Sequence, residues 1–151
     1  MAKRLISIYY GTETGNCKWV AEEIATAAAK RNTVASVHDL VNVSARQFSE
    51  ARDPCVIVIS TWNRGQPPFF ARRFCAELDE GKVSMQGVRF TVIALGNESY
   101  GDFCACGRNV DTQLEKLGAQ RIMPRRDMGA SFKADTSKWL TEFWEALRGM
   151  D

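Results

Sequence analysis

Short apolar runs rich in β-branched and aromatic residues alternate along the chain with longer stretches of helical periodicity. The apolar runs lie at residues 5–10, 34–38, 56–60, 89–95 and 121–123. The first, third and fourth runs are almost continuously apolar, as expected of strands that are covered on both faces. Between the runs, apolar residues recur three or four positions apart at Val20, Ile24 and Ala28, at Val110, Leu114 and Leu117, and at Leu140, Phe143, Trp144 and Leu147. This alternation predicts βαβ units that build an open, doubly wound α/β sandwich around a five-stranded parallel sheet.

Length and charge limit what the chain can be. Its 151 residues suffice for one domain, which we expect to span residues 1–151. The formal net charge of +2 is too small to indicate nucleic-acid binding. The longest apolar run, at 55–59, is far shorter than the roughly 20 residues of a membrane span, and no secretory signal is recognisable. We therefore expect a cytoplasmic protein that neither binds nucleic acid nor inserts into a membrane.

The cysteines and the histidine give no support for a metal site or a disulfide framework. The five cysteines are irregularly spaced, and the closest two, Cys104 and Cys106, do not form a C-x-x-C motif. His38 is the only histidine, so a zinc site is not expected. We predict reduced, buried thiols and no bound metal.

Three loops are candidates for a ligand site, because ligands of such sheets bind outside the carboxyl ends of the strands. The loop at 11–18 leads directly into a predicted helix. Its glycines, its threonines and the unpaired N–H groups of the helix start could hold a phosphate with neutral donors alone. The alternative is a capped helix start, with Thr12 or Thr14 as N-cap and nothing bound. The loop is neither a Walker A motif nor a dinucleotide-binding G-x-G-x-x-G motif.

The loops after the third and fourth predicted strands each carry a large aromatic residue. Trp62 lies in the glycine- and proline-rich stretch 60–68, and Tyr100 lies in the stretch 96–104. An aromatic side chain exposed at a ligand-binding edge is costly unless it stacks on something. The two rings could therefore enclose a flat conjugated ring system. The alternative is that both rings pack against each other or against the helices.

In these loops the chain resembles the flavodoxin family, and the resemblance extends over essentially its whole length. Residues 12–17 resemble the family's S/T-x-S/T-G-x-T/A loop for the FMN phosphate. Residues 60–62 and 95–103 resemble the loops that carry the two flavin-stacking aromatics, with Tyr100 at the second position. Residues 114–122 are similar to the FMN domains of diflavin reductases such as cytochrome P450 reductase. No insertion interrupts the fifth predicted strand, which is typical of short-chain flavodoxins.

The resemblance implies the strand order 2-1-3-4-5 in a flavodoxin-like three-layer sandwich, and noncovalently bound FMN. It further implies one-electron transfer between a reductase and an acceptor enzyme, without a catalytic residue of the protein's own. Trp62 and Tyr100 would flank the flavin ring, and backbone groups of the last two loops would bond its edge. The implied cofactor-binding residues are Thr12, Glu13, Thr14, Gly15, Asn16, Cys17, Thr61, Trp62, Asn63, Arg64, Gly65, Leu95, Gly96, Asn97, Tyr100, Phe103 and Cys104.

Two residues depart from the family pattern at the flavin. Cys17 stands where a threonine is common, which removes a hydroxyl donor but not the backbone N–H. Asn63 stands where the family usually has a glycine whose peptide reorients to bond the reduced flavin. Asparagine adopts left-handed conformations less freely than glycine. We therefore expect the one-electron-reduced flavin to be less stabilised than in relatives.

The charge around the expected flavin edge also departs from the family, whose members place acidic residues there. Arg64, Arg72 and Arg73 follow the third predicted strand, and residues 125–127 bring further arginines. This basic edge predicts redox partners with an acidic docking surface and a raised reduction potential. The alternative is a solvated arginine-rich face without a partner.

Two other functions stay open at this point. Altered loops could leave a flavodoxin-fold interaction or regulatory module with weak or no flavin binding, although the retained aromatics and phosphate-loop residues argue against it. A small flavin reductase would need a nicotinamide site, for which the sequence shows no candidate. We expect a monomeric electron carrier rather than an enzyme.

Overall fold

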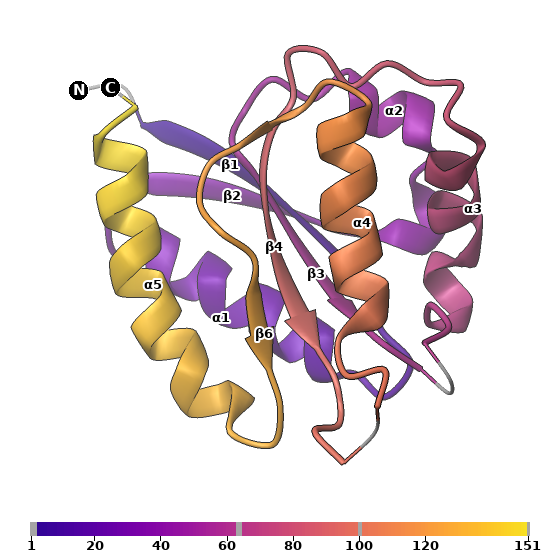
Figure 1. Cartoon of the computed structure of the whole chain (residues 1–151). Coiled ribbons are helices and arrows are strands. Elements are labelled where there is room, and N and C mark those ends of the chain that lie inside the picture. The colour runs from indigo at the N-terminus through magenta and orange to yellow at the C-terminus, as the bar shows by residue number, and fades with distance from the viewer. Residues whose placement is uncertain (1–2, 63–64, 100, 151) are drawn as a thin grey trace.

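The computed structural model of the chain describes residues 3–62, 65–99 and 101–150, and it shows a parallel sheet between two layers of helices (Figure 1). The strands are β1 (Arg4–Gly11), β2 (Thr33–Asp39), β3 (Cys55–Ser60), β4 (Arg89–Leu95), β5 (Gln120–Arg121) and β6 (Arg126–Met128). The α-helices are α1 (Asn16–Ala29), α2 (Ala45–Ser49), α3 (Arg72–Glu80), α4 (Ala105–Lys116) and α5 (Phe132–Arg148), and two 3₁₀ helices are η1 (Leu40–Asn42) and η2 (Phe69–Ala71). Strands β1 to β4 and helices α1, α4 and α5 lie where the periodicity of the sequence predicts them.

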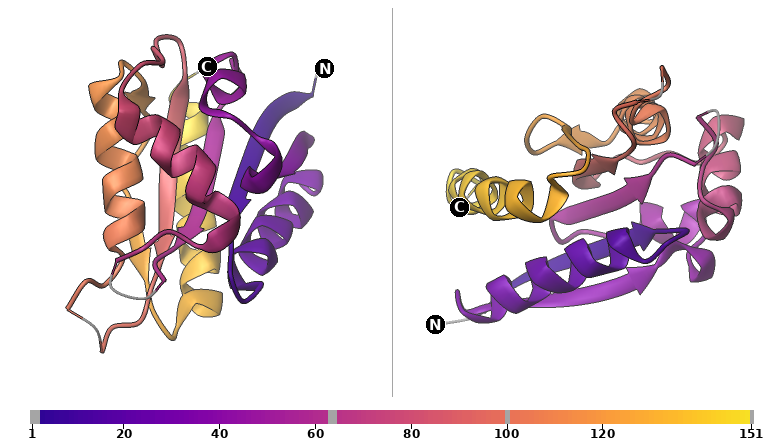
Figure 2. Two further views of the ribbon diagram at one scale, coloured as in Figure 1. Left: turned by 90° about the vertical axis from the view of Figure 1, so that its right-hand side faces the viewer. Right: turned by 90° about the horizontal axis from the view of Figure 1, so that it is seen from below.

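The strands pair in the order β2-β1-β3-β4-β5, all parallel, and β6 also pairs with β4. This is the order that the resemblance implies, so the predicted doubly wound three-layer fold is confirmed. Helices α1 and α5 cover one face of the sheet, and α2, α3 and α4 lie on the other (Figure 2). The chain changes direction across the sheet between β1 and β3, which is where ligands of such folds bind.

Each face of the sheet has its own apolar core, supplied by alternate residues of the central strands. Ile8 of β1 packs with Val20 and Ile24 of α1 and with Trp139 of α5. Tyr9, the next residue of β1, belongs to the core on the opposite face, because successive strand residues point to opposite sides. The four-residue spacing of α1 aligns Val20 and Ile24 in one stripe, which is completely buried.

The last strand differs from the prediction of one strand at 121–123. It is split into β5, which pairs with the beginning of β4, and β6, which pairs with its end. Pro124 lies between them and has no N–H to donate to the ladder. At the break, the hydroxyl of Thr91 in β4 donates a hydrogen bond of 3.1 Å to the carbonyl of Met123. A side chain of β4 therefore bonds a backbone acceptor where the two short strands separate.

All five cysteines are free and buried, and their burial agrees with the prediction. Among the described residues, no group of three or more His, Cys, Asp or Glu side chains could hold a metal ion. No helix within these ranges is long and apolar enough to cross a membrane.

Candidate functional site

The carboxyl ends of the strands form the lower edge of the sheet in Figure 1, which faces the viewer in the right-hand view of Figure 2. A pocket of about 450 Å³ opens at this edge. Its walls come from the segments that follow β1, β3, β4 and β6. The volume lies in the range of small-molecule sites, roughly 300–1,000 Å³. A larger groove of about 580 Å³ lies between α1 and α5. Its walls are helices whose backbone N–H groups are used within the helix, so it offers few free backbone donors.

The loop after β1 combines a helix cap with free backbone donors. Gly15 precedes α1 with a left-handed φ of 94°. The hydroxyl oxygen of Thr12 accepts hydrogen bonds from the N–H groups of Gly15 at 2.9 Å and Cys17 at 3.4 Å. Thr12 therefore holds the backbone at the helix start, but the N-cap residue is Gly15, whereas the alternative interpretation of this loop expects Thr12 or Thr14. The N–H groups of Thr14 and Asn16 have no partner among the described residues, and they remain available to an anion at the positive end of the helix dipole.

Two side chains of this loop interact with other parts of the protein. The carboxylate of Glu13 accepts a hydrogen bond of 2.8 Å from the N–H of Phe69 in η2, which ties the loop to the segment after β3. Cys17 is completely buried. Burial raises the pKa of its thiol to about 12, although hydrogen bonds with Ser60 and Thr12 act in the opposite direction. Cys17 therefore supports the loop as a neutral core side chain.

The segment after β3 presents Trp62 beside the pocket. The N–H of Trp62 donates to the carbonyl of Gln66 at 2.7 Å, which closes the turn, and Gly65 has a positive φ of 81°. The Trp62 side chain is 43% exposed, and a large exposed indole at the mouth of a pocket is typical of a stacking surface. Thr61 is held between neighbouring elements, because its hydroxyl accepts a hydrogen bond of 2.8 Å from the N–H of Cys106 in α4.

The segment after β4 comes very close to the start of α4. A Cβ atom on Gly96 would lie 2.8 Å from the backbone nitrogen of Cys104, so only glycine fits there without movement. The Gly96 N–H donates to the carbonyl of Met128 at 3.0 Å, and the side-chain oxygen of Asn97 accepts from the N–H of Ser99 at 2.9 Å. These bonds shape the backbone that the sequence predicts to meet the flavin edge.

Cys104 is a core residue at the N-cap of α4. It has a left-handed φ of 58°, it is completely buried, and its thiol donates to the carbonyl of Ala94 at 3.2 Å. Burial and the nearby Asp127 carboxylate raise the pKa of this thiol to about 12. The thiol is therefore neutral at physiological pH.

The structure brings many of the predicted cofactor-binding residues together and separates others from the pocket. The pocket wall contains Glu13, Thr14, Asn16, Thr61, Trp62, Leu95, Gly96 and Asn97. The wall does not include Thr12, Gly15, Cys17, Gly65, Phe103 and Cys104. Asn63, Arg64 and Tyr100 lie outside the described residues.

One wall of the pocket was missed by sequence reasoning. Gly129, Ala130 and Phe132 line it, together with Glu98 from the segment after β4. The carboxylate of Glu98 accepts a hydrogen bond of 3.1 Å from the Ala130 N–H, and a Cβ atom on Gly129 would overlap that carboxylate. The segment was overlooked because the last strand was expected to end at residue 123 rather than at Met128. Gly129 directly after an apolar residue was the available signal.

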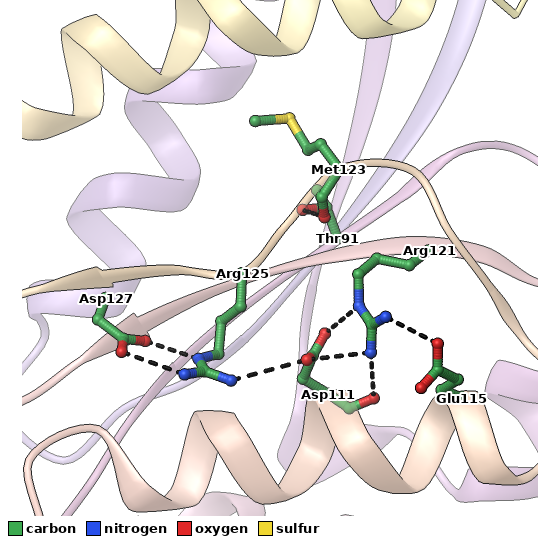
Figure 3. Close-up of polar contacts among 7 residues, drawn as sticks. All are labelled: Thr91, Asp111, Glu115, Arg121, Met123, Arg125 and Asp127. Atoms are coloured by element: carbon green, nitrogen blue, oxygen red, sulfur yellow. Dashed lines mark hydrogen bonds and ion pairs between the residues drawn. The ribbon is translucent and has the colours of Figure 1, made fainter.

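The arginines near the last strand are paired with carboxylates of other elements (Figure 3). Arg121 bonds Asp111 and Glu115 of α4, and Arg125 bonds Asp127 while it lies 3.7 Å from the Asp111 carboxylate. These contacts raise the pKa values of both arginines. Arg126 pairs in turn with Glu142 of α5. The segment therefore contributes less free positive charge to this edge of the molecule than its sequence indicates.

The doubly wound sheet and the pocket at its carboxyl edge define a class of nucleotide- and flavin-binding α/β proteins. The model of the family described as Flavodoxin matches residues 8–144, so the chain belongs to the flavodoxin family, as its loops predict. FMN is the cofactor of this family and of the reductase domains that the chain is similar to.

Several curated proteins are similar to the chain over most of its length. The sulfite reductase (NADPH) flavoprotein alpha-component of Thiocapsa roseopersicina is 33% identical over 146 residues, which cover 96% of this chain and 28% of the relative. The corresponding protein of Bacillus subtilis (strain 168) is 31% identical over 136 residues, which cover 89% of this chain and 22% of the relative. NADPH–cytochrome P450 reductase of Bos taurus is 32% identical over 151 residues, which cover 95% of this chain and 22% of the relative. The chain thus spans 22–28% of the length of these relatives.

Proposed function

We propose that the chain is an FMN-dependent one-electron carrier that passes electrons between a reductase and an acceptor enzyme. The observation that carries the proposal is the pocket at the carboxyl edge, where free N–H groups at the start of α1 and the exposed ring of Trp62 converge. Membership of the flavodoxin family supports it. The relatives include a sulfite reductase (NADPH) flavoprotein alpha-component and an NADPH–cytochrome P450 reductase, so we propose an NADPH-dependent reductase as the electron donor.

The phosphate end of FMN fits the loop after β1. The N–H groups of Thr14 and Asn16 are free to donate among the described residues, and the exposed Thr14 hydroxyl adds a third donor. The helix dipole of α1 favours a negative group at this position. Thr12 contributes indirectly, since its hydroxyl holds the N–H groups of Gly15 and Cys17 and so maintains the shape of the loop.

The ring end fits the segments after β3 and β4. Trp62 supplies an apolar face, and the missing side chain of Gly96 lets a ligand approach the backbone. We propose Tyr100 as the second stacking residue on the basis of its position in the sequence. FMN supplies the one-electron chemistry when bound. The protein's side chains bind the cofactor, orient it and shield its ring from water.

We propose that the redox partner presents acidic groups around an apolar contact. Phe69 and Phe70 of η2 are exposed, and the guanidinium of Arg72 lies 5.3 Å from the centre of the Phe69 ring. Arg73 is 61% exposed and is only loosely paired with Glu77, at 3.8 Å. Complementary charges accelerate association and select partners. The proposed docking surface is therefore the segment 69–73 beside the pocket, on a monomeric protein.

The experiment that tests the function is a fluorescence titration of flavin-free protein with FMN, with riboflavin as the control. Each charge-assisted hydrogen bond contributes about 1.5–3 kcal/mol, so two bonds to the phosphate predict FMN binding at least ~100-fold tighter than riboflavin binding. Equal affinity for the two flavins would contradict the assignment of the phosphate loop. Absence of quenching by both would favour the alternative, a flavodoxin-fold interaction or regulatory module.

A further inference from the structure

Two cysteines from different helices are in direct contact beside the pocket. Cys75 of α3 and Cys106 of α4 are 6% and 5% exposed, and their thiols are hydrogen-bonded to each other. The other three cysteines bond to oxygen atoms instead. Cys17 bonds Ser60 and Thr12, Cys55 bonds the Asp53 carbonyl, and Cys104 bonds the Ala94 carbonyl.

The contact between the two thiols is held in place by other bonds between the helices. The carboxylate of Asp79 in α3 accepts hydrogen bonds from the side chains of Asn109 at 3.0 Å and Gln113 at 3.2 Å, both in α4. These bonds fix the two helices relative to each other on the side where the cysteines meet. The sulfur atoms therefore stay within reach of each other.

The pair is accessible to small molecules. Cys75 and Cys106 both line a cavity of about 280 Å³ next to Gly65 and Pro67, and Arg72 lines the same cavity one helical turn before Cys75. The thiolate is the reactive form of a cysteine, and the cavity gives peroxide access to both sulfur atoms. Cys17, Cys55 and Cys104 are by contrast completely buried.

We propose that Cys75 and Cys106 form a redox-active dithiol that hydrogen peroxide converts into an intramolecular disulfide. The Cys75 thiolate attacks one peroxide oxygen, the O–O bond breaks, and the products are a Cys75 sulfenic acid and hydroxide, which takes up a proton. The Cys106 sulfur then attacks the Cys75 sulfur, and the sulfenic oxygen leaves as a second water. In balance, two thiols and one peroxide give one disulfide and two waters.

The order of the two attacks follows from the hydrogen bond between the thiols. The hydrogen bond with Cys75, and after it burial, raises the pKa of Cys106, so Cys106 is the thiol that keeps its proton and donates it to the Cys75 sulfur. Cys75, which accepts this hydrogen bond, is then the sulfur that attacks the peroxide, and it lies in the wall of the same cavity as Arg72. The proposal needs no bound flavin, so it stands or falls independently of the proposed function.

The test is peroxide oxidation of the reduced 151-residue chain, followed by alkylation and peptide mapping without reductant. We expect a single linked pair of peptides containing Cys75 and Cys106, the loss of two thiols per chain, and complete reversal by dithiothreitol. A linked pair that contains Cys17, Cys55 or Cys104, or an unchanged thiol count, would overturn the proposal.

Variants then test the order of attack. In Cys106→Ser, a dimedone-trapped sulfenic acid is expected on Cys75, whereas Cys75→Ser is expected to leave Cys106 unmodified. Cys55→Ala is the matched control, because it removes a buried thiol without a cysteine partner, and it should form the disulfide as the wild type does. Trapping on Cys106 in Cys75→Ser would refute the assigned order. The peptide map of the wild type decides the proposal itself, even if a variant folds poorly.

Discussion

The carboxylate of Asp111 in α4 accepts hydrogen bonds from Nε and Nη2 of Arg121 in β5, at 2.9 and 3.1 Å (Figure 3). The Asp111 side chain is buried, and its second oxygen also lies 3.7 Å from Arg125. One carboxylate thus holds both ends of the stretch that contains Pro124. The break in the last strand is bridged by side chains where backbone pairing is interrupted.

Asp111→Asn is expected to destabilise the protein by about 2 kcal/mol, because the neutral amide loses the charge-assisted hydrogen bonds from Arg121. The free energy of unfolding in urea measures the effect. Glu115→Gln is the matched control, since it removes the other carboxylate on Arg121 at a position that is 61% exposed. An exposed pair contributes about 0–1 kcal/mol. An equal decrease in the free energy of unfolding in the two variants would show that the burial of Asp111 does not strengthen its contribution to stability.

Gly96→Ala is expected to weaken FMN binding by roughly 10-fold or more. The new methyl group would meet the backbone of Cys104 at 2.8 Å, and overpacking of this kind costs about 1–3 kcal/mol. The movement that relieves the clash displaces the edge of the pocket. Flavin titration measures the effect. Gly101→Ala is the control, since nothing lies within 4 Å of a Cβ atom there, and its affinity should match that of the wild type.

Trp62→Ala is expected to weaken FMN binding by about 10- to 100-fold, because base-like stacking on an aromatic ring contributes about 1–3 kcal/mol. Trp62→Phe keeps an apolar plate and should retain most of the affinity. Both variants are compared with the wild type by titration monitored through flavin fluorescence. If the alanine variant binds FMN as tightly as the wild type, Trp62 does not stack on the flavin.

The buried thiols predict a loss of stability at alkaline pH. Burial, with a smaller contribution from Asp53, raises the pKa of Cys55 from 9.0 to about 12. Below pH 9 both the folded and unfolded states keep the proton, and the stabilisation is complete. Between pH 9 and 12 only the unfolded state ionises, so each such thiol lowers the free energy of unfolding by about 1.4 kcal/mol per pH unit.

Cys55→Ala tests this pH dependence under reducing conditions. Urea unfolding at several pH values above 9 gives the free energy of unfolding as a function of pH. In the variant this free energy should fall less steeply with pH than in the wild type, by the equivalent of about one proton. Cys17 and Cys104 have similarly raised pKa values and still contribute in the variant, so the slope should not vanish. An identical slope in both proteins would mean that Cys55 ionises equally in the two states.

The proposed docking surface predicts how small charged oxidants react with the reduced flavoprotein. Oxidation by the ferricyanide anion should slow as salt is added, because salt weakens the attraction of an anion to a positive surface. Oxidation by the cobalt hexaammine cation should accelerate, because salt also weakens the repulsion of a cation. Arg72→Gln should reduce the difference in salt dependence between the two oxidation rates. Arg148→Gln, at the end of α5, is the control and should leave the difference unchanged. The opposite salt dependence would contradict a basic surface beside the flavin.

The positions of the main strands and helices could be predicted because their signals are local. The strands predicted at 5–10 and 34–38 are β1 (Arg4–Gly11) and β2 (Thr33–Asp39), and the stripe at Val20 and Ile24 faces the core. The phosphate-loop motif also lies at the start of α1, as predicted. In each case the residues that carry the signal are neighbours along the chain, so period and turn chemistry are sufficient.

Other features depend on residues that are distant in sequence. Arg125 and Arg126 belong to the basic edge that the sequence predicts, but their carboxylate partners Asp111 and Glu142 come from other elements. The wall at 129–132 was missed because the split of the last strand moves its end to Met128.

The sequence by itself determined the class of fold, the family and the three loops that carry the cofactor motif. Only the tertiary structure decided how side chains are paired, including the contact of Cys75 with Cys106 and the hydrogen bond between Thr61 and Cys106. The physical reason is that periodicity records how each residue is oriented relative to the core. The partner of a polar or thiol group is determined by which distant elements the packing brings within about 3–4 Å of it.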